Sequence, residues 1–122
     1  MPAPLAKVLV VDHGTTVLPI IVAIVGDAGY DVQVCASTIA VIVAEGYQPD
    51  VVIFDLVMPG PYTCDLLTHF RRALPHIPVV LIGQEVDART TEHLLNKEAF
   101  AYITKPFTAG MITDVLRRAL DE

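Results

Sequence analysis

The chain has 122 residues, enough for one hydrophobic core but not for two, and 53% of them are hydrophobic while only 18% are charged. Its net charge is −6, and its basic residues form no stripe, which argues against direct binding of nucleic acid. The longest apolar run, Val17–Val25, is too short to span a membrane, and the first residues do not resemble a secretory signal. We therefore expect one soluble, cytoplasmic domain over residues 1–122, with no output domain within them.

Five short runs rich in Val and Ile predict buried strands, because their apolar residues are continuous rather than alternating. In chain order, the expected strands are Lys7–Val11, Asp31–Cys35, Val51–Phe54, Val79–Ile82 and Phe100–Thr104. The expected helices between and after them are Thr15–Ala28, Thr38–Glu45, Thr63–Leu74, Asp87–Lys97 and Thr108–Leu120. Strict alternation of strands and helices indicates an α/β fold, with a parallel sheet, right-handed crossovers and helices on both faces.

The first two predicted helices are apolar nearly all round, which leaves two interpretations open. They belong to a deep core with a few exposed aliphatic side chains, or they form a partner-binding patch. Pro19 predicts a late start or a kink in the first helix. Gly29 and Gly46 stand where helices are expected to end, and Thr108 is a candidate N-cap of the last helix.

Three charged residues follow predicted strands and define a candidate site. Asp12 ends the first strand, Asp55 ends the third and Lys105 follows the fifth. Ligands of open parallel sheets bind outside the carboxyl ends of the strands, so these groups are expected to converge there. Two neighbouring carboxylates need a counter-charge, which a hard divalent cation such as Mg²⁺ supplies. The lysine can hold a phosphoryl oxygen while an Asp55 oxygen attacks phosphorus and forms an acyl phosphate.

Four sequence blocks occur in an order that makes this hypothesis more specific. They are Val-Val-Asp-His at 10–13, Phe-Asp-Leu-Val-Met-Pro-Gly at 54–60, Pro-Val-Val-Leu-Ile at 78–82 and Tyr-Ile-Thr-Lys-Pro-Phe at 102–107. Together they resemble the signature blocks of response-regulator receiver domains of two-component signalling, over essentially the whole chain. The resemblance implies a flavodoxin-like (βα)5 fold, a doubly wound sheet of five parallel strands in the order 2-1-3-4-5.

The resemblance also implies roles for individual residues. Asp55 matches the phosphoacceptor, Asp12 the first acid of the metal site, and Lys105 the phosphate-contacting lysine. Val57 matches the residue whose backbone carbonyl ligates Mg²⁺, and Tyr102 matches the aromatic that rotates on activation. The bond between Lys105 and Pro106 is expected to be cis, as is usual in the family. The implied phosphate donor is a histidine kinase or histidine phosphotransfer protein, and the apolar first helix is a candidate surface for that partner or for a homodimer.

Two residues depart from the family pattern. His13 replaces a second acid at the metal site; it either ligates the metal, which would weaken Mg²⁺ binding and favour Mn²⁺ or Zn²⁺, or only lines the site. Gly83 replaces the Thr or Ser whose hydroxyl bonds the phosphoryl group, so the usual coupling to Tyr102 lacks one hydrogen bond. A water molecule or Gln84 could take the place of that hydroxyl.

Three functions are therefore weighed. The first is a receiver phosphorylated on Asp55 with weakly bound Mg²⁺ or Mn²⁺; the second is a pseudo-receiver that binds partners without phosphorylation. The third is an enzyme of the same fold class, such as a flavin-binding protein, but residues 13–16 contain a single glycine and lack the spacing of a nucleotide loop. We expect a signalling phosphoacceptor rather than a metabolic enzyme.

Overall fold

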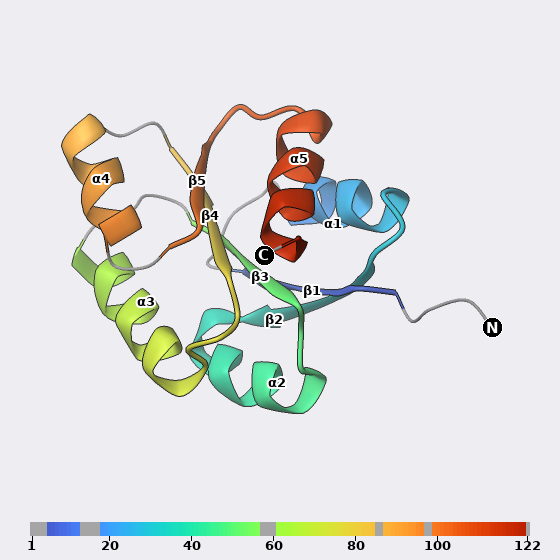
Figure 1. Cartoon of the computed structure of the whole chain (residues 1–122), viewed down its shortest axis with the longest axis horizontal. Helices are drawn as coiled ribbons and strands as arrows, with labels where there is room; N and C mark the ends of the chain where they lie inside the picture. Colours follow the sequence, from blue (N-terminus) through green and yellow to red (C-terminus); the bar gives the residue numbers. More distant parts are fainter. Residues whose placement is uncertain (1–4, 13–17, 57–60, 85–86, 97–98, 122) are drawn as a thin grey trace.

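The computed structural model describes residues 5–12, 18–56, 61–84, 87–96 and 99–121, and these form a five-stranded parallel sheet between two layers of helices (Figure 1). The strands are β1 (Lys7–Asp12), β2 (Asp31–Ala36), β3 (Val51–Asp55), β4 (Val79–Gly83) and β5 (Ala101–Thr104). Their order in the sheet is β2-β1-β3-β4-β5, so the predicted flavodoxin-like order is confirmed. The helical elements are α1 (Leu18–Asp27), the short 3₁₀ helix η1 (Ser37–Ile39), α2 (Ala40–Tyr47), α3 (Pro61–Ala73), α4 (Ala88–Asn96) and α5 (Ala109–Leu120).

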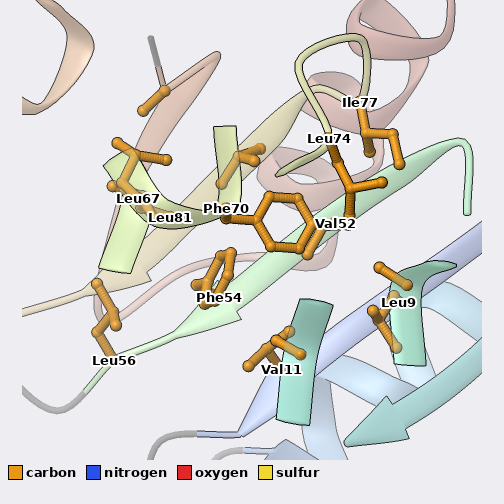
Figure 2. Packing of buried hydrophobic residues seen from close by; sticks show 14 of the residues in the cluster. Leu9, Val11, Val52, Phe54, Leu56, Leu67, Phe70, Leu74, Ile77 and Leu81 are labelled. Carbon is orange, nitrogen blue, oxygen red and sulfur yellow. The ribbon is translucent and has the colours of Figure 1, made fainter. Parts of the chain in front are cut away.

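The core has two halves because successive residues of a strand point to opposite faces of the sheet. On one face, Phe54 of β3 packs edge-to-face on Phe70 of α3, with ring centroids 5.5 Å apart (Figure 2). Buried residues of α2 and α4 belong to the same half. On the other face, Ile53 packs in a cluster with Ile21 of α1 and Leu116 of α5. Each buried aliphatic or aromatic side chain of this size stabilises the fold by about 1.5–3 kcal/mol.

The prediction that every strand is buried is wrong for β2 and for most of β5, the opposite edge strand, in which only Ile103 is buried. All five residues of β3 and all five of β4 are buried, whereas Cys35 is the sole buried residue of β2. The physical reason is position: β2 lies at the edge of the sheet and has a strand neighbour on one side only. Its apolar composition therefore does not reflect burial within this chain.

Helix boundaries follow the expected signals in part. The described part of α1 runs from Leu18 to Asp27 and includes Pro19, while residues 13–17 lie outside the described residues, so the predicted late start stays a prediction. Gly29 follows α1 with φ +95°, a conformation that glycine adopts without steric cost. The prediction that Gly46 ends the second helix is wrong: α2 continues to Tyr47, and Gln48 takes the left-handed conformation with φ 55°.

Thr108 caps α5 as predicted, since its side-chain oxygen accepts a hydrogen bond of 3.2 Å from the Met111 amide. None of the helices in the described ranges is both long and apolar enough to cross a membrane.

A polar network ties the amino-terminal ends of the strands together, at the edge opposite the candidate site. The Lys7 amide donates to Asp50 Oδ2 at 2.8 Å, and Lys7 Nζ donates to the Tyr47 carbonyl at 3.3 Å. The Tyr47 hydroxyl donates to a carboxylate oxygen of Asp31. Burial, together with the hydrogen bond to Asp31, raises the pKa of Tyr47.

Candidate functional site

The carboxyl ends of the strands bring together residues that are far apart in sequence. Parallel pairing of β1 with β3 places Asp12 directly opposite Asp55. Pairing of β4 with β5 places Gly83 opposite Thr104, and the Lys105 amide then donates to the Gly83 carbonyl at 2.8 Å. The predicted convergence of Asp12, Asp55 and Lys105 at this edge is thus what the sheet register produces.

Asp55 and Lys105 form the centre of the site. The Asp55 side chain has no exposed surface, the Lys105 side chain is 13% exposed, and Lys105 Nζ lies 2.9 Å from Asp55 Oδ1. Lys105 Nζ also donates to the Leu56 carbonyl at 3.0 Å. The ion pair with Asp55 and the hydrogen bond to Leu56 hold the ammonium group beside the carboxylate, as a charge buried away from water requires a partner of opposite sign.

The charges at this edge are suited to a divalent cation. Asp12 is the register partner of Asp55, and Lys105 is paired with Asp55, so among the described residues two carboxylates accompany one ammonium group, and a further cation would offset the excess negative charge. Carboxylate oxygens are the hard ligands that Mg²⁺ and Mn²⁺ prefer. Within the described ranges, no group of three or more His, Cys, Asp or Glu side chains could hold a metal ion.

The predicted switch residues occupy neighbouring strands. Gly83 ends β4 and is buried, and Tyr102 of β5 is half-buried. The Tyr102 hydroxyl donates a hydrogen bond to the Gln84 backbone carbonyl, directly after Gly83. Burial raises the pKa of Tyr102 to about 12. Tyr102 therefore contacts the segment after β4 through a main-chain group and needs no side chain at position 83 to do so.

The remaining expectations are met in part. The peptide bond between Lys105 and Pro106 is cis, as the resemblance implied. His13 and Val57 lie outside the described residues, so their predicted roles at the metal site stay predictions. Sequence reasoning missed both main-chain acceptors, the carbonyls of Leu56 and Gln84. Every residue has a backbone carbonyl, so the sequence does not indicate which carbonyls accept side-chain hydrogen bonds.

Comparisons with known proteins agree with this geometry. A family model described as the response regulator receiver domain matches residues 8–117. The DNA-binding transcriptional regulator NtrC of Rhizobium meliloti is 31% identical over 119 residues, covering 96% of this chain and 24% of that protein. Chemotaxis protein CheY-3 of Vibrio cholerae is 28% identical over 119 residues, covering 94% of this chain and 92% of that protein. A receiver domain protein from Clostridium thermocellum has a TM-score of 0.83 at 28% identity, covering 96% of this chain and 95% of that structure.

The coverage of these relatives differs. The chain spans about a quarter of the length of the NtrC relatives, but most of the length of CheY-3. The family match at residues 8–117 includes all five strands that build the carboxyl edge, apart from the first residue of β1, and it includes Asp12, Asp55 and Lys105. The chain therefore belongs to the response regulator receiver domain family.

Proposed function

We propose that this receiver accepts a phosphoryl group on Asp55 from a histidine kinase or a histidine phosphotransfer protein. The observation that carries the proposal is the fully buried Asp55 carboxylate with the Lys105 ammonium 2.9 Å from its Oδ1. Burying a carboxylate costs desolvation free energy that an ion pair often does not recover, so a role in chemistry explains the buried Asp55 better than stability does. The lysine beside it is a point charge suited to a phosphoryl oxygen.

The proposed reaction is an in-line displacement. An Asp55 oxygen attacks phosphorus, the bond from phosphorus to the donor's imidazole nitrogen breaks, and the imidazole leaves with the electron pair and takes a proton from water. The product is a mixed anhydride on Asp55. Lys105 would stabilise the negative charge on the transferred phosphoryl oxygens while remaining held by the Leu56 carbonyl.

A divalent metal is part of the proposal because the ligand chemistry fits. Asp12 and Asp55 offer oxygen atoms from the ends of two adjacent, register-paired strands. The negative charge of these two carboxylates exceeds the positive charge of Lys105. Mg²⁺ or Mn²⁺, when bound, would offset the charge that collects as carboxylate and phosphoryl oxygens approach each other. We assign Asp12 and Asp55 as ligands, together with the Val57 carbonyl, and His13 as a further candidate that would weaken Mg²⁺ and favour Mn²⁺.

The proposed docking surface for the phosphodonor is α1, which follows the Asp12 end of β1 in the chain. Its described residues carry no charged side chain before Asp27 at its last position, and Ile20 is exposed. An apolar helix beside a buried phosphoacceptor suits a helical partner that presents its own histidine. Direct contact with nucleic acid is not part of the proposal, because the net charge is −6.

A second candidate function is a pseudo-receiver, which binds partners without phosphorylation. The observation in its favour is Gly83, which offers no hydroxyl to a phosphoryl group, together with the hydrogen bond from Tyr102 to the Gln84 carbonyl. Because Tyr102 already contacts the segment after β4, the chain could present the same surface to a partner with or without phosphorylation.

The experiment that separates the two is intact-mass spectrometry after incubation with acetyl phosphate and Mg²⁺, repeated with Mn²⁺ and with a kinase that has phosphorylated its own histidine. A phosphoryl adduct on the wild type that is absent from Asp55→Asn supports the receiver. Asp55→Asn is a matched control because it keeps the shape of the side chain and removes its charge. A folded wild type that gains no phosphoryl group from either donor with either metal contradicts the receiver and supports the pseudo-receiver.

A further inference from the structure

Among the described residues, exposed hydrophobic side chains are frequent on the consecutive elements α1, β2, η1 and α2, and Val34 is the one that lies on the edge strand β2. Seven large hydrophobic residues are exposed in the described part of the chain, and four of them lie on the consecutive elements α1, β2, η1 and α2. These four are Ile20, Val34, Ile39 and Ile42, of which Ile42 is the most exposed at 72%. β2 is the edge strand, and both α1 and α2 contact it (Figure 1).

The same segment is almost free of charge. From Leu18 to Ala44 the sequence contains no Lys or Arg, and its two acids, Asp27 and Asp31, lie at the end of α1 and the start of β2. Proteins usually protect an edge strand with lysine, proline or a bulge, because its outer backbone groups can pair with another strand. β2 has the sequence Asp-Val-Gln-Val-Cys-Ala and carries neither lysine nor proline.

The pairing of β2 with β1 determines which backbone groups face outward. The Asp31 amide donates to the Ala6 carbonyl at 2.9 Å, so Asp31 directs its amide toward β1. Because this direction alternates along a strand, Val32, Val34 and Ala36 direct their amide and carbonyl groups to the open side. Their side chains share one face of the sheet, and all three are apolar.

We propose that the β2 edge is a homodimer interface, in which β2 of two copies pair antiparallel about a two-fold axis at Val34. This register is the one in which outward-facing residues meet each other: Val34 pairs with Val34 of the second copy, and Val32 pairs with Ala36. Asp31 then lies opposite Ser37, so no two acids of the strands meet although each copy has a net charge of −6.

A second copy fits this edge better than a charged partner or a phosphodonor helix. The two-fold arrangement satisfies the outward backbone groups of both strands with one another, which a helix cannot do. The segment also lacks the charges that would select a basic or acidic partner, and a low charge content is typical of the centre of a protein interface. The proposal does not rest on phosphorylation of Asp55.

The test compares two substitutions of equal exposure. Val34 and Met111 are each 41% exposed, Val34 at the proposed axis and Met111 on α5, away from the β2 edge. Sedimentation equilibrium of the wild type without phosphodonor is expected to give twice the chain mass of 13.2 kDa. Val34→Lys, which places two ammonium groups opposite each other, is expected to be monomeric under the same conditions, and Met111→Lys is expected to remain dimeric.

A crosslinking readout keeps the test decisive if Val34→Lys fails to fold. Residues paired across an antiparallel two-fold axis have Cα atoms about 5.5 Å apart, within the range that a disulfide can bridge. Val34→Cys is expected to form a covalent dimer on mild oxidation, and Met111→Cys is not. A wild type that is monomeric at all concentrations, a folded Val34→Lys variant that remains dimeric, or a Val34→Cys variant that forms no covalent dimer overturns the proposal.

Discussion

The ammonium group of Lys105 lies 2.9 Å from Oδ1 of Asp55, a carboxylate with no exposed surface. The two residues come from the turn after β5 and from the end of β3, strands that are separated in the sheet by β4. Their ion pair therefore depends on correct assembly of three strands, and it links the stability of the fold to the chemistry of the site.

Removal of the lysine is expected to destabilise the fold. Lys105→Met leaves the buried Asp55 carboxylate without its ammonium partner, and we expect the free energy of unfolding to fall by roughly 2–4 kcal/mol. Urea denaturation followed by circular dichroism measures this change. Arg117→Met is a suitable control, because Arg117 and its partner Asp114 are both well exposed and such pairs contribute little.

The double variant Asp55→Asn/Lys105→Met tests whether the loss comes from the pair itself. Because the neutral amide needs no counter-charge, the double variant is expected to be more stable than Lys105→Met alone, with a coupling energy of at least about 1 kcal/mol. Additive effects of the two substitutions would contradict the account of a mutually dependent ion pair.

Restoring the hydroxyl at position 83 is expected to strengthen the response of Tyr102 to phosphorylation. Gly83→Thr places an oxygen beside the candidate site, at a cost of about 1–3 kcal/mol in stability because the position is buried. Nuclear magnetic resonance of the Tyr102 ring measures the response as the shift change on phosphorylation. Gly83→Ala is the control, since it adds bulk without a hydroxyl. Equal shift changes in the wild type, Gly83→Ala and Gly83→Thr would contradict the proposed role of the missing hydroxyl.

The tyrosines predict a loss of stability at alkaline pH. Burial raises the pKa of Tyr102 to about 12, above the value of about 10 in the unfolded chain. Between these values the folded protein binds more protons than the unfolded chain, so the free energy of unfolding is expected to decrease as the pH rises. Tyr47 acts in the same direction. Denaturation at a series of pH values should show a smaller slope for Tyr102→Phe and for Tyr47→Phe than for the wild type. An unchanged slope in both variants would contradict this assignment.

Much of the fold was predictable because the residues that build it carry local signals. Continuous apolar runs predict β3 and β4, whose residues are all buried, and Thr108 predicts the cap of α5. The same signal failed for β2, because an apolar run does not reveal whether a strand lies at the centre or the edge of a sheet. Gly46 also gave the wrong boundary for α2, since one glycine lowers helix propensity by only about 1 kcal/mol and does not by itself end a helix.

The candidate site was predictable to the extent that side chains define it. Asp12, Asp55 and Lys105 could be placed at one edge from their positions after strands. The contacts that orient them involve main-chain oxygens: Leu56 holds Lys105, and Gln84 holds Tyr102. Any residue type offers such an oxygen, so only the folded geometry identifies which of them take part.

The measurement that tests the central claim most directly is chemical mapping of the phosphorylated residue. Borohydride reduces an aspartyl phosphate to homoserine, which peptide mass spectrometry locates at a single position. After incubation with a phosphodonor and Mg²⁺ or Mn²⁺, the account predicts homoserine at position 55 and at no other acidic residue. Homoserine at a different position, or a phosphoryl group carried by a histidine of this chain, would contradict the assignment of Asp55 as the phosphoacceptor.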